Sequence, residues 1–298
     1  MRWTSSLGRF TDQESWSIVG RLTETRHSPL CIGPHYQMGW VFALWMRRLA
    51  SFSRWRNSGM EDGMAEQQRI VGAVFARGGS KGVPRKCLRR VGGRTLLEIA
   101  VSDALQVDRL ERIVVSTDDA EYAAAAEAAG AEVPFLRPTE LASDTAAEVD
   151  SWRHLISFLD QDGVRPDILV TLPATAPLRN PSDVDDALDL FLRVGADLVV
   201  TGTPAARHPS FNMVAVDDEG WAAIASPVQG GLVRRQDAPQ LWDLATVTFV
   251  ADTTYVETTR HLFDGRVALS PVPRERAIDI DDEFDLVVAD LLASSGRL

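Results

Sequence analysis

The hydrophobic pattern becomes regular from residue 69 onward, where short apolar runs alternate with longer stretches of helical spacing. Short apolar runs bounded by turn residues are typical of buried strands, and apolar positions three or four apart are typical of amphipathic helices. The predicted strands are residues 69–76, 112–117, 167–172 and 196–202, and the predicted helices are residues 94–107, 118–130, 147–160 and 181–194. Strands that alternate with helices predict an α/β fold with a mostly parallel sheet, flanked by helices and joined by right-handed crossovers.

The pattern weakens after residue 203. Two short apolar runs, residues 211–216 and 245–251, predict strands, and residues 253–263 have the spacing of a helix. A last, acidic helix is expected at the carboxyl end of the chain. We expect residues 67–298 to form one domain.

Residues 1–66 differ from the rest in composition. They contain five of the eight Trp, and residues 1–60 carry eight Arg against three acidic residues. Trp and Arg could form a peripheral anchor at a membrane surface, but the apolar run MGWVFALW is too short to span a bilayer. We favour an N-terminal extension that is disordered or results from a misassigned start codon, and we expect no stable membrane insertion.

Composition narrows the classes of function. The 298 residues carry a net charge of −11, which disfavours a nucleic-acid groove because such surfaces are usually basic. Cys31 and Cys87 are too few for a disulfide framework and too scattered for a zinc site, so a cytoplasmic location fits best. The five His show no metal-ligand spacing either.

A glycine-rich stretch, ARGGSKGVPRK at residues 76–86, follows the first predicted strand and contains both lysines of the chain. Glycine lets a backbone approach a ligand closely and turn its N–H groups inward. The stretch lacks the spacing of a Walker A loop and of a dinucleotide fingerprint. Its cationic and hydroxyl side chains are Arg77, Ser80, Lys81, Arg85 and Lys86. So many donors at a strand end indicate a polyphosphate site, and chance placement of two lysines in an exposed loop is the alternative.

The acidic stretch AIDIDDEFDL, residues 277–286, admits two interpretations. If its first half is extended, Asp279 and Asp281 face the same side and could hold Mg²⁺ together with phosphate oxygens. Acidic residues also favour a helix N-terminus. We assign metal binding to this aspartate pair. The residues assigned to helix capping are Asp282, Glu283 and Asp285.

Several motifs, in this order, resemble the acylneuraminate cytidylyltransferases, the CMP-sialic acid synthetases. They are ARGGSKGVPRKCL, VVSTDDAEYA, GAEVPFLRPTELASDTA, TAPLR, RRQDAP and RERAIDIDDEFDL, within residues 69–292. The resemblance implies a Rossmann-like nucleotidyltransferase fold, usually a homodimer, that uses Mg²⁺. It also implies a reaction in which the hydroxyl of a 2-keto sugar acid attacks the α-phosphate of CTP and releases pyrophosphate.

The same resemblance implies roles for individual residues. Those implied to be catalytic are Arg77, Lys81 and Lys86, and those implied to bind the nucleotide are Gly78, Gly79, Ser80, Gly82 and Arg137. Arg235 and Gln236 match substrate-binding positions, and the pair Asp279 and Asp281 matches metal ligands. Lys81 would stabilise the charge that grows on the departing pyrophosphate. For Arg137, a surface position beside a helix is the alternative.

The acceptor half departs from the family pattern. Pro173 stands for a usual Gln, Ala245 stands for a usual Asn, and Cys87 replaces a usual Asn after the second lysine. Asp243 falls where a basic residue often helps to hold the carboxylate of the sugar acid. An anion there would repel that carboxylate by on the order of several kcal/mol in a desolvated site. We therefore expect an acceptor other than N-acetylneuraminate, such as another nonulosonic acid or a deoxy-octulosonic acid.

Two other functions stay open at this point. One is a nucleotidyltransferase of the same fold with another nucleotide or a non-sugar acceptor, and Arg137 with its flanking motif argues against it. The other is a non-catalytic nucleotide-binding module. The lysines of the glycine-rich stretch and the pair Asp279 and Asp281 argue against such a module.

Overall fold

The computed structural model describes residues 68–295 except 81, 144 and 233. The expectation for residues 1–66 lies outside this described part and stays a prediction. Among the helices that the structure describes, none has the length and apolar character needed to cross a membrane.

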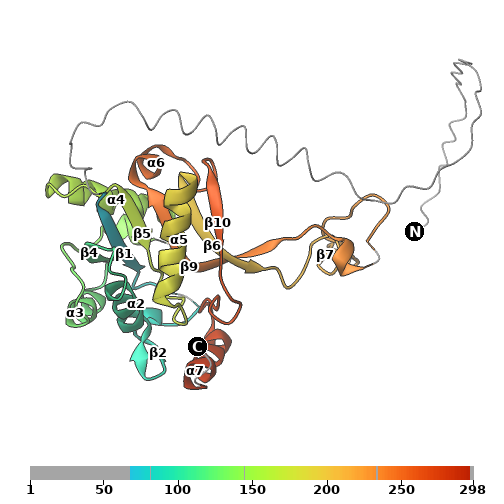
Figure 1. Ribbon diagram of the computed structural model, residues 1–298. Helices are drawn as coiled ribbons and strands as arrows, with labels where there is room; N and C mark the ends of the chain where they lie inside the picture. Colours follow the sequence, from blue (N-terminus) through green and yellow to red (C-terminus); the bar gives the residue numbers. More distant parts are fainter. Residues whose placement is uncertain (1–67, 81, 144, 233, 296–298) are drawn as a thin grey trace, which may run out of the picture. The chain divides into compact units, whose positions relative to one another are not determined.

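Six strands form one sheet in the order β10–β6–β9–β5–β1–β4 (Figure 1). They are β1 (Ile70–Ala76), β4 (Arg112–Thr117), β5 (Ile168–Thr171), β6 (Leu198–Pro204), β9 (Trp242–Asp252) and β10 (Val267–Pro271). β9 runs antiparallel to both of its neighbours, whereas the other pairs are parallel. The predicted mostly parallel α/β sheet is confirmed.

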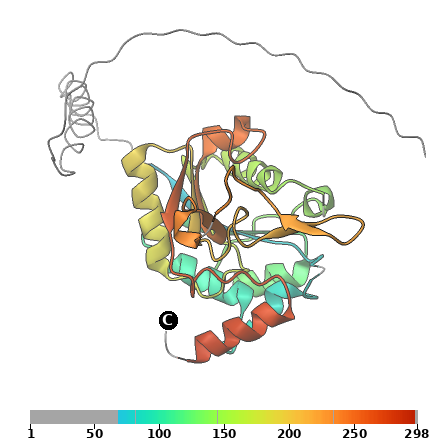
Figure 2. The same ribbon diagram turned by 90° about the vertical axis from the view of Figure 1, so that its right-hand side faces the viewer.

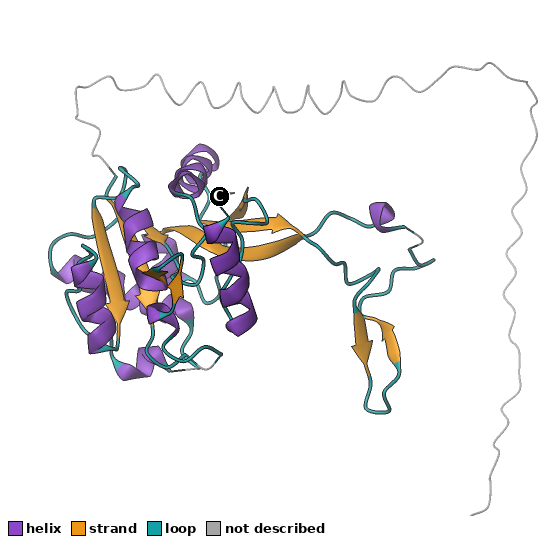
Figure 3. Cartoon of the chain, turned by 90° about the horizontal axis from the view of Figure 1, so that it is seen from below, coloured by secondary structure: helices purple, strands orange, loops and turns teal. Residues whose placement is uncertain are grey.

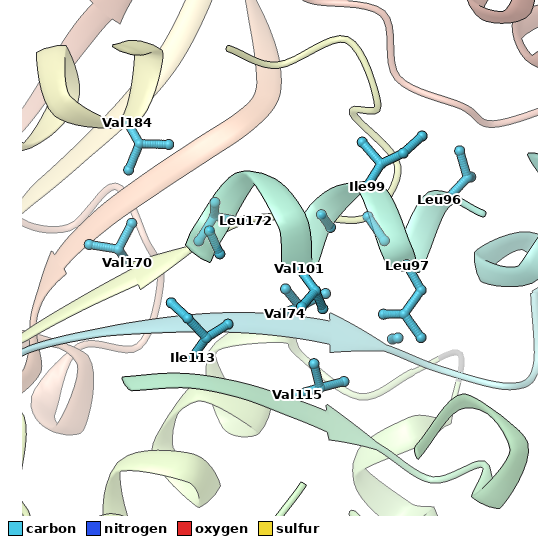
Figure 4. Close-up of a cluster of buried hydrophobic side chains, with 14 of the residues drawn as sticks. Val74, Leu96, Leu97, Ile99, Val101, Ile113, Val115, Val170, Leu172 and Val184 are labelled. Carbon is cyan, nitrogen blue, oxygen red and sulfur yellow. The ribbon is translucent and has the colours of Figure 1, made fainter. Parts of the chain in front are cut away.

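Helices cover both faces of this sheet (Figure 2). Side chains alternate along β1, so that Val74 and Ala76 contribute to one core while Val71 and Ala73 contribute to another. Residues of α2 (Leu96–Leu105), α3 (Ala120–Ala128), α5 (Pro181–Val194) and α7 (Glu283–Ser294) join the first core. Figure 4 shows part of it, with α2 packed over β1 and β4. Residues of α4 (Glu148–Gln161) and α6 (Thr253–Thr258) join the second core. Both faces of the sheet are therefore shielded from water, and the central strands are accordingly almost wholly apolar.

The last helix begins directly after the acidic segment. Asp282 is its N-cap and accepts backbone N–H groups of the first turn, while the Asp285 carboxylate accepts the N–H of Asp282 at 3.0 Å. This capping box confirms the prediction for both residues. Glu283 in the same turn binds the guanidinium of Arg89 with its two carboxylate oxygens. The segment before the helix is thus fixed at its carboxyl end.

The connection between β6 and β9 leaves the sheet (Figures 1 and 3). This connection, residues 205–241, is called the arm below, and it carries a hairpin of β7 (Val214–Val216) and β8 (Ala222–Ile224) and the 3₁₀ turn η3 (Arg235–Asp237). The strand predicted at residues 211–216 is confirmed for its second half. The remaining short elements are β2 (Arg90–Val91), β3 (Arg94–Thr95), η1 (Lys86–Leu88) and η2 (Thr139–Ala142).

The predicted helix at residues 253–263 is wrong beyond Thr258. Thr259 is extended, and the chain continues in turns. The guanidinium of Arg153 in α4 donates to the carbonyl oxygens of Val256 and Thr259. Since this contact comes from a distant part of the chain, helical spacing alone did not reveal where the helix ends.

Candidate active site

A cavity of about 500 Å³ lies at the carboxyl end of β1, where the glycine-rich loop begins. We call it the first cavity. Its lining is Phe75, Arg77, Ser80, Gly82, Lys86, Cys87, Arg137, Leu141, Ser143, Ala146, Glu148, Ser151, Thr175 and Asp281. Six of these belong to the residues assigned from the sequence: Arg77, Ser80, Gly82, Lys86, Arg137 and Asp281. Open α/β sheets bind ligands beyond the carboxyl ends of their strands, so the position agrees with a ligand site.

Two glycines of the loop contact other parts of the site through their backbone. The backbone N–H of Gly78 donates to Asp118 Oδ1 at 3.0 Å, which ties the loop to the end of β4. A Cβ atom at Gly82 would lie 2.2 Å from the carbonyl oxygen of Asp281, so only glycine allows this close approach. A Cβ atom at Gly79 would meet no heavy atom within 4 Å. The loop therefore packs backbone to backbone against the acidic segment.

Lys86 links the loop to the same segment. Its side chain is 13% exposed, and Nζ donates to the carbonyl oxygen of Ile280 at 2.5 Å and lies 3.2 Å from Asp281 Oδ1. Arg85, counted from the sequence among the donors of the polyphosphate site, points away from the first cavity. Its Nη2 donates to Glu121 Oε2 at 2.5 Å, which directs the guanidinium toward α3. Arg85 also adopts a left-handed conformation, with φ of 53°, that turns the chain before Lys86.

Arg137 is the most buried cation of the first cavity, with a side chain 4% exposed. Its Nη1 donates to Ser151 Oγ at 3.3 Å, and its Nη2 lies 3.9 Å from Asp118 Oδ1. Burial lowers the pKa of the Arg137 guanidinium, and the nearby Asp118 carboxylate opposes this shift. The surface position considered from the sequence is wrong, because Arg137 is a fixed donor inside the cavity.

The two aspartates assigned to metal binding line neighbouring cavities. Asp281 is exposed and borders the first cavity. Asp279 borders a second cavity of about 480 Å³. Burial raises the pKa of the Asp279 carboxyl, while the hydroxyl of Thr175 lowers it. Within the described part of the chain, Asp279 Oδ1 is buried and has no hydrogen-bond partner.

The charged residues of the second cavity are mainly acidic. Its lining is Thr203, Ala206, Asp243, Leu244, Ala245, Arg274, Glu275, Ala277, Ile278, Asp279, Asp285 and Leu292. Two positions that depart from the family pattern, Asp243 and Ala245, are therefore neighbours of Asp279. Asp243 Oδ2 accepts the backbone N–H of Ala206 at 3.1 Å, so this carboxylate also fixes the start of the arm. At another of the departing positions, the carbonyl oxygen of Pro173 accepts a hydrogen bond from Arg179 Nη2 at 2.5 Å.

The remaining assigned residues lie apart from the first cavity or outside the described residues. Arg235 and Gln236 lie in η3 of the arm and are exposed. Arg235 borders a third cavity, with His208 and Arg207. Lys81 lies outside the described residues, and its catalytic role stays a prediction.

Asp118 is a residue of the site that was not among those assigned from the sequence. This residue accepts the N–H of Gly78 and lies beside Arg137, so it orients two parts of the first cavity at once. Its position in the sequence could have indicated this role, because Asp118 follows directly after β4, which neighbours β1. Polar residues at the carboxyl ends of adjacent parallel strands converge at one sheet edge.

A glycine-rich loop, two fixed cations and an acidic segment at the carboxyl end of β1 define a nucleotide-binding α/β enzyme. Comparison of sequences gives the family: the model of the cytidylyltransferase family matches residues 71–239. The chain belongs to this family and is a nucleotidyltransferase. Post-translational flagellin modification protein B of Campylobacter coli is 30% identical over 230 residues, which are 77% of this chain and 97% of that protein.

Other relatives carry names that describe their products. A CMP-N,N'-diacetyllegionaminic acid synthase of Campylobacter jejuni is 30% identical over 230 residues, again 77% of this chain and 97% of that protein. A pseudaminic acid cytidylyltransferase of the same species is 27% identical and is covered over 94% of its length, against 74% of this chain. Among solved structures, CMP:2-keto-3-deoxy-manno-octonic acid synthetase complexed with CTP has a TM-score of 0.56 and 19% identity. The match covers 76% of this chain and 99% of that one, and it confirms the nucleotidyltransferase fold.

Proposed function

We propose that this protein transfers CMP from CTP to a 2-keto sugar acid and releases pyrophosphate. The observation that carries the proposal is the first cavity. There Arg77, Lys86 and Arg137 meet the glycine-rich loop at the carboxyl end of β1. Three cations are suited to a triphosphate, whose oxygens need several donors at once. The names of the relatives support CTP as the nucleotide and a nonulosonic acid as the acceptor.

In this proposal the residues of the first cavity mainly position charge. Arg137 is held by Ser151 and Asp118, so it needs little reorganisation when a nucleotide binds. Lys86 is mostly buried and already ordered against Ile280 and Asp281. A preordered ammonium beside the phosphates stabilises the charge that develops on leaving pyrophosphate.

We propose Mg²⁺ as the metal, held by Asp279 and Asp281. The described residues contain no group of three or more acidic, His or Cys side chains that could hold a metal alone. Mg²⁺ usually takes one or two carboxylates and completes its shell with waters and phosphate oxygens, so a pair of carboxylates is enough for it. The unpartnered buried oxygen Asp279 Oδ1 is an oxygen ligand of the required kind. When bound, Mg²⁺ would neutralise phosphate charge and orient the phosphates.

We further propose that the protein is a homodimer that pairs through its arm. Val214, Val216 and Ile224 lie on one face of the hairpin, because Val214 pairs with Ile224 and side chains alternate along a strand. All three are exposed, and Trp221 in the connecting turn is 77% exposed. Apolar faces of this kind on the surface of a chain indicate a protein interface.

The cytoplasmic location stays a prediction.

The test is the rate of pyrophosphate release from CTP with Mg²⁺ and four acids in turn. These are N,N'-diacetyllegionaminic, pseudaminic, N-acetylneuraminic and 2-keto-3-deoxy-manno-octonic acid. Lys86→Met should lower the rate with the accepted acid by about a hundredfold or more. Arg85→Met is the matched control in the same loop, because its guanidinium points to α3, and it should retain most of the rate.

Two results would contradict the proposal. One is an absence of pyrophosphate release with all four acids although the protein is folded. The other is a Lys86→Met variant as active as Arg85→Met. Release with UTP or ATP at the same rate as with CTP would instead indicate another nucleotidyltransferase of the same fold.

A further inference from the structure

A third cavity of about 230 Å³ lies at the base of the arm. It is formed by the chain that leaves β6, residues 204–208, and by the chain that returns toward β9, residues 235–241. The polar side chains in its lining are those of Arg207, His208, Arg235 and Gln240, and none of its lining residues is acidic. The third cavity therefore differs in charge from the second cavity, which contains four carboxylates.

His208 borders the third cavity and carries a ring nitrogen without a hydrogen-bond partner. The residue is 8% exposed, and its Nδ1 accepts the backbone N–H of Ser210 at 3.0 Å. An Nδ1 that accepts a hydrogen bond is unprotonated, so the ring hydrogen is on Nε2. Within the described residues, this Nε2 is buried and has no partner. A buried donor without an acceptor is costly and rare, and a bound ligand is one explanation for it.

Arg235 and the backbone before Arg207 are held by contacts at the two ends of the arm. Arg235 Nη2 donates to the carbonyl oxygen of Ala205 at 2.6 Å, which joins the returning chain to the leaving one. The Asp243 carboxylate binds the N–H of Ala206, directly before Arg207. Asp243 thus orders the segment that carries Arg207 and His208.

We propose that the third cavity binds the carboxylate of the acceptor through His208 Nε2, Arg207 and Arg235. A carboxylate offers two oxygens to the imidazole N–H and the two guanidinium groups, and it meets no like charge among the lining residues. Without a bound cation, the second cavity would repel the same group, because its acidic residues outnumber its single arginine, Arg274. The identity of the acceptor rests on the proposed function. The assignment of His208 and Arg207 goes beyond it.

The test separates the donor of His208 from its local structural role. In His208→Asn, the amide oxygen can still accept the N–H of Ser210, but no donor replaces Nε2. In His208→Gln, the longer side chain returns an amide donor near the position of Nε2. With the accepted acid, His208→Asn should raise the KM for the acid about tenfold or more and leave the KM for CTP unchanged. His208→Gln should restore much of the loss.

Arg207→Gln should likewise raise the KM for the acid by about tenfold. The matched control is Arg193→Gln, which replaces an exposed arginine on α5 and should leave this KM unchanged. Equal KM values for wild type and His208→Asn would overturn the inference. Equal losses in His208→Asn and His208→Gln would also overturn it, because they indicate a structural role only.

A second measurement does not depend on turnover. The imidazole ¹⁵N signals of the full chain are recorded with each of the four acids, with acetate and with inorganic phosphate, and the His208 signal is identified by its absence from His208→Asn. A shift of that signal with a sugar acid supports the site even if no acid releases pyrophosphate. Pyrophosphate release with an acid that leaves the signal unmoved, or a shift with phosphate and with none of the acids, would overturn the inference while the proposed function stands.

Discussion

Replacing Asp103 by Asn is expected to remove a pH-dependent loss of stability. Asp103 lies in α2 and is buried, and its Oδ2 is 3.8 Å from Nη1 of the fully buried Arg179. Neither of these two atoms has a hydrogen-bond partner within the described residues. Arg179 donates instead to the carbonyl oxygens of Val247 and Pro173, so it ties β9 to the loop that carries Thr175. The two charged groups are therefore buried together without a direct hydrogen bond between these atoms.

The magnitude follows from the pKa of Asp103. Burial raises it from 3.8 to about 6, and the Arg179 guanidinium opposes the shift only in part. Burial likewise lowers the pKa of Arg179 to about 10. Because the folded state binds the Asp103 proton more tightly than the unfolded state, stability falls as pH rises through the range from about 4 to 6. The full shift corresponds to about 3 kcal/mol, of which about 2 kcal/mol falls between pH 4.5 and pH 8.

The assay is urea unfolding of wild type and Asp103→Asn at pH 4.5 and pH 8. The wild type should lose about 2 kcal/mol of unfolding free energy through Asp103 between pH 4.5 and pH 8, and the variant should not. The stability of the variant relative to the wild type should therefore rise by about 2 kcal/mol over this range. Asp108→Asn, which removes an exposed carboxyl in the loop after α2, controls for the loss of one negative charge. The reasoning would be refuted if the difference in unfolding free energy between variant and wild type did not change with pH. It would also be refuted if the variant were less stable than the wild type at pH 8. The second result would mean that the pair with Arg179 is net stabilising.

Three further predictions concern the loop, the buried thiol and the arm. Gly82→Ala should lower the rate of pyrophosphate release by about tenfold or more, because its Cβ would collide with the backbone of the acidic segment, whereas Gly79→Ala, whose Cβ would meet no protein atom, should lower it less. Equal rates for the two variants would contradict this. Burial raises the pKa of Cys87 to about 12, so its peptide should stay unlabelled by iodoacetamide at pH 8 in the native protein and become labelled in urea. Fast native labelling, seen by mass spectrometry, would show that the thiol is accessible and ionised. Val216→Asp should shift the mass measured by light scattering toward that of a monomer, whereas Ala215→Asp, on the other face of the hairpin, should shift it less. A wild-type chain that is already monomeric would refute the dimer.

The sheet and most of its helices were predictable from the sequence because local pattern and tertiary environment agree there. The stretch of residues 181–194 is a clear case. Asn180 caps the helix, Pro181 suits its first turn, and Gly195 ends it in a left-handed conformation. The end of α6 was not predictable, since a guanidinium from another helix determines it.

The candidate site was predictable in its residue types and less so in its geometry. The spacing of the glycine-rich loop indicated a phosphate site, but Arg85 and Lys86 are adjacent in sequence and point in different directions. Asp119 and Glu121 at the start of α3 attract the first, and Ile280 and Asp281 order the second. Such choices depend on acceptors supplied by other elements. Periodicity does not reveal them.

The most direct measurement is a ³¹P NMR spectrum of the full chain with CTP, Mg²⁺ and each of the four sugar acids. The account predicts that one acid yields a new phosphodiester signal together with an equal amount of pyrophosphate, while the CTP signals decline. Unchanged CTP with every acid, or hydrolysis of CTP to CMP without a new phosphodiester, would contradict the central claim that this protein transfers CMP to a sugar acid.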